Sequence, residues 1–556
     1  MNFKFIKFIL EKKKWTVIFI SFVILFTVPF YAFTENLTRK DIFLAWVVNL
    51  FALVAFSAIS LFLKGKWEKT YLIILFILFL FPNMIVFSYM YIASMHMYHD
   101  MFWVIFATNP AESQEYIDEA VPWRLIWCII GYIVVASFLL FLSLSSKSSS
   151  ISSSLKKNKI FFTFCVVVLV IIASSQVLSK SFGSIDFYKS SYQFFAESYR
   201  LKKEVTSYKR HEIDVSCGLK QTGNTFVVVI GESLSRNHMQ IYGYHRKTTP
   251  MLDSMKTDLH IYTDVISPNT HTIAVLKSVL TFADQNHPKY YFDKPSIVDL
   301  FESAGFTTYW ISNQELLSKW GGSYGIIAQG ANYVYDLSSE KKTDEIVLPT
   351  LYEILEEKKD ENKIIFIHLM GSHNAYKCRY PANFSYFNYE TDTIPNKPYL
   401  RDESRRLIDE YDNSVLYTDF ILSSIIKKMQ EKEDSPSVVL FFSDHAEEVF
   451  DFRDVVGHFI QGTSRFQCEI PFILWYSNGY KNEKTDLIFE ENRPFITEDF
   501  IYSISSLAKL NYKDFEPERS LFESKFTHRE RRVGDVTYEE VLQKKFKSRK
   551  KQNPLP

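Results

Sequence analysis

Acidic and imidazole side chains follow two apolar runs of this chain, in a pattern that could bind a divalent metal ion. The run Val227–Ile230 is followed by Glu232. The run Val438–Phe442 is followed by Asp444 and His445. Carboxylate oxygens and imidazole nitrogens are ligands that zinc accepts in proteins. Either motif alone is more often a set of solvated loop residues, but two motifs after matching runs favour a metal site.

A threonine between these two motifs could supply a nucleophile. Thr272 lies in the segment 267–273, which reads SPNTHTI. A hydroxyl beside a metal ion can lose its proton near neutral pH and attack phosphorus. Threonines are common, however, and most have other roles such as helix capping. Thr272 is therefore a weak signal when it is taken alone.

Three further histidines lie close to predicted strand ends. His368 and His373 accompany the run 363–370, and His458 follows the pair Asp444-His445. Such histidines could bind phosphate, bind a second metal ion or protonate a leaving group. A single histidine is more often an ordinary polar or packed residue. We favour a functional role for His373 and His458, whereas His368 is equally well explained as a packed residue within its strand.

The elements that would position these residues are short apolar strands that alternate with helices. Strands are predicted at 225–230, 307–312, 363–370, 437–443 and 471–476, and helices at 296–304, 344–359 and 403–432. Continuous apolar strands separated by helices are typical of a mostly parallel sheet covered on both faces. Ligands of such sheets bind beyond the carboxyl ends of the strands, which is where the candidate residues fall.

The amino-terminal part of the chain is predicted to be an α-helical membrane domain. Each helix needs roughly 20 apolar residues to cross a hydrocarbon core of about 30 Å. Five segments are long enough: Trp15–Phe33, Phe43–Leu63, Tyr71–Ala93, Leu125–Leu144 and Ile160–Leu178.

Charge in the loops predicts the orientation of these spans. Lysines precede the first span and lie between the second and third and between the fourth and fifth, whereas the loop 95–123 is acidic. Because lysine-rich loops stay in the cytoplasm, the amino terminus is predicted to be cytoplasmic and the soluble domain to lie outside. No ATP is available there, so a transferred group must come from a lipid or another activated compound.

Composition excludes some other classes of protein. The chain has 556 residues, and its 63 basic and 63 acidic residues cancel to a net charge of +0. This balance argues against nucleic acid as a partner, because a nucleic-acid-binding protein usually carries a broad positive field. Cys217, Cys378 and Cys468 are the cysteines of the soluble part, so at most one disulfide bond could form there.

Four separated motifs resemble those of a known family. They are VIGES at 229–233, YGYHRKTTP at 242–250, LTFAD at 280–284 and FSDHAEE at 442–448. In this order they are similar to the phosphoethanolamine transferases of Gram-negative inner membranes, which belong to the alkaline phosphatase and sulfatase superfamily. The similarity covers nearly the whole chain, including five spans with an outward catalytic domain.

The resemblance implies a zinc site and a nucleophile. It implies that one zinc ion is surrounded by Glu232, Thr272, Asp444 and His445. Thr272 would accept the phosphoethanolamine group.

The resemblance also implies contacts to the substrate. His373 and His458 would contact the substrate phosphate or a second zinc ion. Asn109 and Glu112, in the outer loop, resemble a segment that reaches the active site and would contact substrate. A turn with a helix cap explains that loop equally well.

The implied domains and departures complete the comparison with the family. We expect a transmembrane domain at 1–180, interfacial linker helices at 181–220, a periplasmic sulfatase-like catalytic domain at 221–535 and a basic tail at 536–556. Members that modify lipid A usually carry several disulfides, whereas this chain has three soluble cysteines. The segments 280–284 and 288–300 are more similar to the branch that modifies the lipopolysaccharide core. Phe466 stands where some of that branch carry a histidine, which leaves the second metal or phosphate site open.

The reaction that the resemblance implies has two steps. Thr272 attacks the phosphorus of phosphatidylethanolamine and diacylglycerol leaves. The group then passes to lipopolysaccharide, on core heptose or lipid A, which makes the cell surface more cationic. We expect a monomer in contact with membrane lipid. The alternatives are a phosphoglycerol transferase of the lipoteichoic acid synthase type and a non-catalytic membrane sensor.

Overall fold

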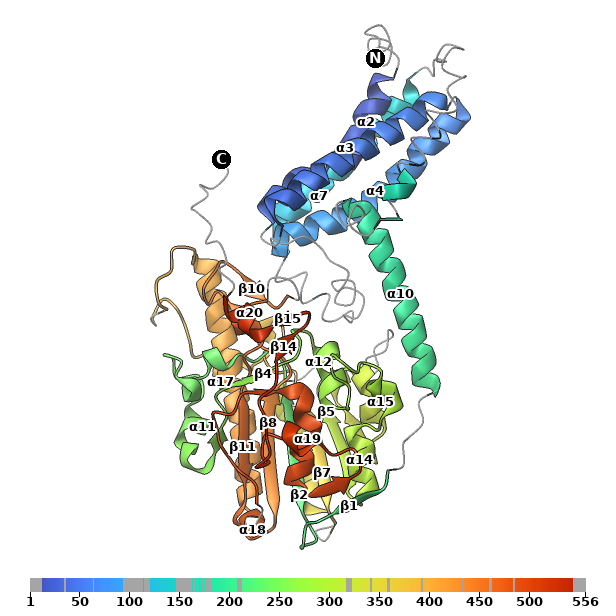
Figure 1. Cartoon of the computed structure of the whole chain (residues 1–556). Helices are drawn as coiled ribbons and strands as arrows, with labels where there is room; N and C mark the ends of the chain where they lie inside the picture. The colour runs from blue at the N-terminus through green and yellow to red at the C-terminus, as the bar shows by residue number, and fades with distance from the viewer. Residues whose placement is uncertain are drawn as a thin grey trace. The chain divides into compact units, whose positions relative to one another are not determined.

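The computed structural model divides into two compact units, residues 1–200 and 201–556 (Figure 1). It describes residues 13–543 apart from 35–36, 64, 94–113, 115–120, 147–162, 164–166, 168, 173, 176–181, 208–212, 317–322, 341–342, 358–360, 392–393, 433, 460–462 and 484–485.

Long apolar helices form the first unit. They are α2 (Lys14–Leu25) with its 3-10 extension η1 (Val28–Phe33), α3 (Arg39–Phe62), α4 (Lys66–Ala93) and α7 (Trp123–Ser145). Within the described part of the chain, four helical segments are long and apolar enough to cross a membrane: Lys14–Phe33, Arg39–Ser60, Lys66–Ile92 and Trp123–Ser145. Their outer faces carry exposed apolar side chains, as expected of surfaces that contact lipid. Most of the predicted fifth span, 160–178, lies outside the described residues.

Helix α10 (Gly183–Ser207) is joined to α4 by a hydrogen bond that a proline makes available. Pro82 lies inside α4 and has no N–H, so it cannot donate to the carbonyl oxygen of Leu78 one turn earlier. The hydroxyl of Tyr188, on α10, donates to that oxygen over 2.9 Å. Further along α10, the side chains of Tyr192 and Tyr199 are each 76% exposed. A location of α10 at the membrane interface stays a prediction.

A seven-stranded sheet forms the centre of the second unit, in the order β3-β11-β8-β2-β7-β5-β6. Its strands are β2 (Thr225–Gly231), β3 (His260–Ile261), β5 (Thr307–Ser312), β6 (Tyr333–Asp336), β7 (Lys363–His368), β8 (Ser437–Ser443) and β11 (Phe472–Tyr476). Strands β8, β2, β7, β5 and β6 are parallel, and β11 pairs antiparallel with both β8 and β3. The predicted combination of apolar membrane helices and a mostly parallel α/β domain is confirmed.

Helices cover both faces of this sheet (Figure 1). One face packs against α12 (Thr272–Val279), α14 (Ile297–Ser303), α15 (Ser323–Gln329) and α19 (Phe500–Leu507). The other packs against α11 (Pro250–Ser254), α16 (Val347–Glu356) and α17 (Asp402–Gln430). In β2, Val228 and Ile230 face the first layer while Val227 and Val229 face the second. Burial on both faces explains why the strand sequences are continuously apolar rather than alternating.

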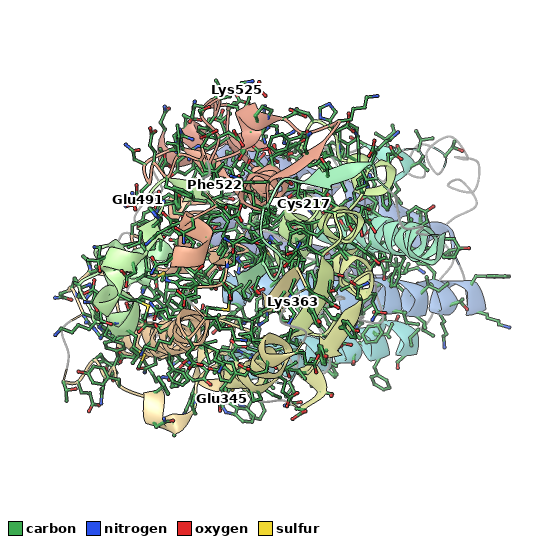
Figure 2. The ribbon with its side chains drawn as sticks, turned by 90° about the horizontal axis from the view of Figure 1, so that it is seen from below. Cys217, Glu345, Lys363, Glu491, Phe522 and Lys525 are labelled. Carbon is green, nitrogen blue, oxygen red and sulfur yellow. The ribbon has the colours of Figure 1, made fainter. Side chains whose placement is uncertain are left out.

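Smaller elements complete the unit. Two-stranded ladders are formed by β1 (Val215–Cys217) with β13 (Leu510–Tyr512), β4 (Val265–Ile266) with β12 (Phe495–Ile496), β9 (Glu448–Val449) with β10 (Val456–Gly457), and β14 (Arg532–Val533) with β15 (Val536–Thr537). The short helices are α13 (Tyr290–Asp293), α18 (Asn478–Lys481) and α20 (Tyr538–Gln543). Figure 2, a view from below, labels Cys217 on β1 and Lys363 at the start of β7. Each cysteine that the structure describes, Cys217 included, is a free thiol.

Candidate active site

Parallel pairing of β2 and β8 brings the two predicted motifs side by side. Gly231 is in register with Ser443, so Glu232 and Asp444 leave the sheet as neighbours. The Oδ1 atom of Asp444 accepts hydrogen bonds from the backbone N–H groups of Ser233 (3.1 Å) and His445 (2.6 Å). The bond from Ser233 joins the two strand ends.

Glu232, Asp444 and His445 form a buried set of metal ligands. Each offers one ligand atom, these atoms lie within 4.8 Å of one another, and all three residues are 0% exposed. The Oδ2 atom of Asp444 is buried and accepts no hydrogen bond, although it lies 3.5 Å from His445 Nε2. Burying a carboxylate oxygen without a hydrogen bond is costly, and a bound cation would offset that cost. Two carboxylates and one imidazole match the ligand preference of zinc.

The charges of this set depend strongly on one another. Burial raises the pKa of Glu232, but the hydrogen bond and charge of His445 outweigh it and hold this pKa well below its usual range. Burial and the charge of Glu232 raise the pKa of Asp444 well above its usual range. Burial lowers the pKa of His445, whereas the two carboxylates raise it, to about 10. A metal ion bound by these residues would compete with the proton on the His445 imidazole.

Thr272 is the first residue of α12 and points at this set. Its Oγ1 donates a hydrogen bond to Glu232 Oε2 over 3.0 Å and lies 3.5 Å from His445 Nε2. The helix starts here because Val275, Leu276 and Val279 place one apolar face in the core. The free N–H groups at this end of the helix favour negative charge nearby. An alkoxide or a phosphate group would be stabilised at this position.

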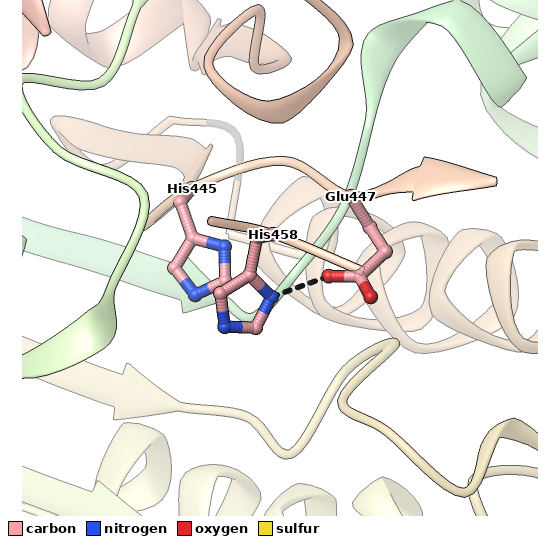
Figure 3. Close-up of side chains that lie close together, drawn as sticks. All are labelled: His445, Glu447 and His458. Atoms are coloured by element: carbon pink, nitrogen blue, oxygen red, sulfur yellow. Dashed lines mark hydrogen bonds and ion pairs between the residues drawn. The ribbon is translucent and has the colours of Figure 1, made fainter. Parts of the chain in front are cut away.

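His458 approaches from the β9–β10 hairpin. Its ring centroid lies 4.3 Å from that of His445 (Figure 3). Its Nδ1 is 2.6 Å from Glu447 Oε2, and the hydroxyl of Tyr376 donates to Glu447 Oε1 over 2.8 Å. His445, Glu447 and His458 are thus a second group whose ligand atoms lie within 4.8 Å of one another.

The other two histidines differ in their surroundings. His373 follows β7, and its Nδ1 atom is buried with no hydrogen-bond partner. His368 is the last residue of β7, fully buried, with its ring 5.3 Å from that of Tyr324. Burial lowers the pKa of His368 to about 4. This placement favours the packed interpretation of His368.

Two further predicted contacts and one departure from the family pattern remain. Asn109 and Glu112 lie outside the described residues. Phe466 stacks on Phe452, with ring centroids 5.5 Å apart, and offers no ligand atom.

Three residues of the site were missed by reasoning from the sequence. Gln314 donates to Glu232, Glu447 binds His458, and His271 places its ring 5.1 Å from that of His458. Gln314 follows the end of β5, so the rule that found Glu232 could have found it too. Glu447 and His271 adjoin residues that were singled out, but no local pattern indicates their partners.

The match to a family model decides the family. The model described as Sulfatase matches residues 224–510, which contain every site residue described above. The chain belongs to the sulfatase family. It is 33% identical over 329 residues to phosphoethanolamine transferase EptC of Escherichia coli K12, a match that covers 57% of this chain and 56% of that protein. The chain thus matches little more than half the length of this relative.

Two solved structures extend the comparison. The C-terminal periplasmic domain of EptC from Escherichia coli, in complex with Zn, is 30% identical with a TM-score of 0.56 and matches 60% of this chain and 96% of that one. The integral membrane lipooligosaccharide phosphoethanolamine transferase A from Neisseria meningitidis has a TM-score of 0.68 and 16% identity, over 91% of this chain and 98% of that one. The second match shows that the fold, apolar helices followed by an α/β unit, is shared. The resemblance that the four motifs indicated is confirmed.

Proposed function

We propose that this chain is a zinc-dependent phosphoethanolamine transferase of a Gram-negative inner membrane. In this proposal phosphatidylethanolamine is the donor and lipopolysaccharide, on core heptose or lipid A, is the acceptor. The observation that carries it is the hydroxyl of Thr272, hydrogen-bonded to Glu232 within the buried set of Glu232, Asp444 and His445. The relatives that are named phosphoethanolamine transferases support the identity of the group that is moved.

Zinc would be held by Glu232, Asp444, His445 and the oxygen of Thr272. When bound, it supplies charge stabilisation for an alkoxide and for phosphoryl oxygens. The donor set and the buried Asp444 Oδ2, which accepts no hydrogen bond, support this assignment. The Zn complex of the EptC periplasmic domain supports zinc over other divalent ions.

The residues of the chain divide the work of the two steps. In the first step, Thr272 Oγ1 forms a bond to phosphorus while the bond from phosphorus to the diacylglycerol oxygen breaks, and diacylglycerol leaves with a proton. In the second, an acceptor oxygen attacks the same phosphorus, the bond from phosphorus to Thr272 Oγ1 breaks, and Oγ1 regains a proton from the acceptor hydroxyl or from solvent. Glu232 Oε2 accepts the hydroxyl hydrogen bond and so aims the lone pairs of Oγ1. Because Glu447 holds Nδ1 of His458, the other ring nitrogen is the one left to meet a phosphoryl oxygen or a leaving group.

The proposed location follows from the membrane unit. The four apolar helices and the lysines in alternate loops support a multi-pass protein with a cytoplasmic amino terminus and a periplasmic catalytic domain. A site held at the membrane can draw on a lipid donor, which agrees with the lack of ATP outside the cytoplasm.

Mass spectrometry of lipopolysaccharide tests the reaction and the acceptor together. Lipid A and core oligosaccharide would be compared from cells that make the wild type, Thr272→Ala or the control Thr418→Ala. Thr418 lies on α17, where its hydroxyl bonds only a backbone oxygen one turn earlier. We expect a phosphoethanolamine mass increment on one fraction from the wild type and the control, and none from Thr272→Ala. A phosphoglycerol increment, or no increment on either fraction despite expression, would overturn the proposal.

Donor and intermediate require a second experiment. Purified protein would be mixed with phosphatidylethanolamine labelled in its phosphate, without acceptor, and then digested. We expect label on the peptide that contains Thr272. Protein treated with a chelator beforehand should not become labelled, and added zinc should restore the labelling. Label that survives in Thr272→Ala would place the intermediate elsewhere.

A further inference from the structure

Gln314 joins three strands of the sheet at the edge where the site lies. It follows the end of β5, and its Nε2 donates to Glu232 Oε2 over 3.0 Å and to the backbone oxygen of Leu369 over 2.9 Å. Glu232 follows β2 and Leu369 follows β7, which lies between β2 and β5 in the sheet. Gln314 therefore reaches across the end of β7 to the carboxylate of Glu232.

The two acceptors determine how the Gln314 amide is oriented. A side-chain amide has one NH2 group with two donors and one oxygen that only accepts. Glu232 Oε2 and Leu369 O are both acceptors, so the opposite orientation would set oxygen against oxygen. The NH2 group thus uses both of its donors, one on a fixed backbone atom and one on the carboxylate. A hydrocarbon side chain of the same size could fill this space but could not hold the carboxylate.

The backbone of Gln314 is held as firmly as its side chain. Ser312 Oγ accepts from the backbone N–H of Gln314 over 3.1 Å and donates to the backbone oxygen of Gln314 over 2.8 Å. Ser312 is the last residue of β5 and is 0% exposed. The side-chain amide therefore extends from a backbone that is held in place. Of its two acceptors, one is the backbone oxygen of Leu369 and the other is the side chain of Glu232.

We infer that Gln314 is a positioning residue that holds Glu232 Oε2 toward Thr272 and the metal ion. Glu232 Oε2 accepts from both Thr272 and Gln314. The hydrogen bond from Thr272 is lost when the hydroxyl gives up its proton, whereas the bond from Gln314 persists through both steps. As a neutral donor, Gln314 orients the carboxylate without cancelling the negative charge that attracts a cation. This inference rests on the proposed function, because it assigns Glu232 to the metal.

Zinc affinity of the full-length protein is the decisive measurement. Zinc alone would be titrated against a chromophoric chelator in competition with the wild type, Gln314→Met, Gln314→Asn, Glu232→Gln and the control Gln240→Met. Gln240 also donates to a carboxylate, Asp253 Oδ2 at 3.2 Å, and neither residue is part of the site. Loss of a hydrogen bond to a ligating side chain typically weakens metal binding by about 10 to 100-fold. We expect that loss for both Gln314 variants, a larger loss for Glu232→Gln and wild-type affinity for Gln240→Met.

Kinetics at saturating zinc separate positioning from packing. We expect Gln314→Met to lower kcat about 10-fold or more, with KM for the lipid within about twofold of the wild type, because a positioning residue acts on the carboxylate rather than on the substrate. Gln314→Asn keeps the amide but is one methylene shorter and cannot bridge both acceptors, so it should fail in the same way. If the methionine variant does not fold, the asparagine variant decides.

Other outcomes would overturn the inference. Wild-type zinc affinity and kcat in Gln314→Met would show that Gln314 only fills space, even if the unfolding temperature fell. Wild-type zinc affinity in Glu232→Gln would overturn the proposed metal site as well, so the two failures are distinguishable.

Discussion

Replacing Gly371 by alanine should disturb the site through the backbone of Glu232. Gly371 lies in the loop after β7 with a φ of +53°, and a Cβ there would lie 2.7 Å from the backbone oxygen of Glu232 and 2.8 Å from its nitrogen. Hydrogen bonds hold the backbones of both Glu232 and Gly371 in place. The oxygen of Glu232 accepts from the Ser372 N–H over 2.9 Å, and the Gly371 N–H donates to Asp344 Oδ2 over 2.8 Å.

The loss of stability expected in Gly371→Ala has two parts, and a comparison with Gly534→Ala separates them. A left-handed backbone costs an alanine about 1 kcal/mol, and an extra methyl group in a packed site costs a further ~1–3 kcal/mol. Gly534 has a φ of +57° and no atom within 4 Å of an added Cβ, so Gly534→Ala should show only the first cost. For a domain of roughly 300 residues the unfolding entropy is about 0.6 kcal/mol/K. Gly371→Ala should therefore melt about 2–5 °C below Gly534→Ala.

The assay compares unfolding temperature and transferase rate for the two full-length variants. A displacement of Glu232 of the order of 1 Å can lower a rate about 100-fold, so we expect that loss in Gly371→Ala and a wild-type rate in Gly534→Ala. Equal melting temperatures and equal rates in the two variants would refute the argument that the loop rests on Glu232.

Two further predictions concern parts of the chain away from this loop. Burial lowers the pKa of His238, but the charges of Asp451 and Asp412 outweigh it and raise this pKa from 6.5 to about 9. The raised pKa stabilises the folded state by at most about 3 kcal/mol. This contribution is complete below pH 6.5 and is lost as pH rises through 9. Chemical denaturation should thus show a gap between wild type and His238→Gln that shrinks from pH 6 to pH 9, and an unchanged gap would contradict the assignment. In the membrane unit, Tyr188→Phe should lower the free energy of unfolding by up to about 1 kcal/mol in the wild type. The loss should be smaller in a Pro82→Ala background, because the new N–H of residue 82 can donate to the carbonyl oxygen of Leu78. Equal losses in a double-mutant cycle would exclude the bond between Tyr188 and that oxygen.

Much of the sheet could be predicted because its strands are buried on both faces. The runs 225–230 and 437–443 were recognised from uninterrupted apolar residues, and the structure has strands at nearly the same positions. Two strands were missed. Strand β3 has only two residues, and β6 is an edge strand with both ends exposed, so neither has an apolar run.

Some residues of the site could be predicted from local sequence, whereas others depend on partners that are distant in the chain. Glu232, Asp444 and His445 were found because they directly follow apolar strands, where ligands of parallel sheets gather. Thr272 was a weak candidate from its place between the two motifs, and the family resemblance strengthened it. Gln314 follows the end of β5 and so met the same rule, but nothing near it in sequence indicated its partner Glu232, which follows another strand 82 positions away.

The sequence by itself determined that a membrane part precedes a water-soluble part, and that strands would end in acidic residues. Both properties follow from the polarity of neighbouring residues, and transfer from water depends on that local polarity. Only the tertiary structure decided which strand ends meet. Strand order and register are set by hydrogen bonds and packing between segments that are far apart in the chain. They bring the N–H of Ser233 to Asp444 Oδ1, which is 211 positions away in sequence. No local window of residues contains that pair.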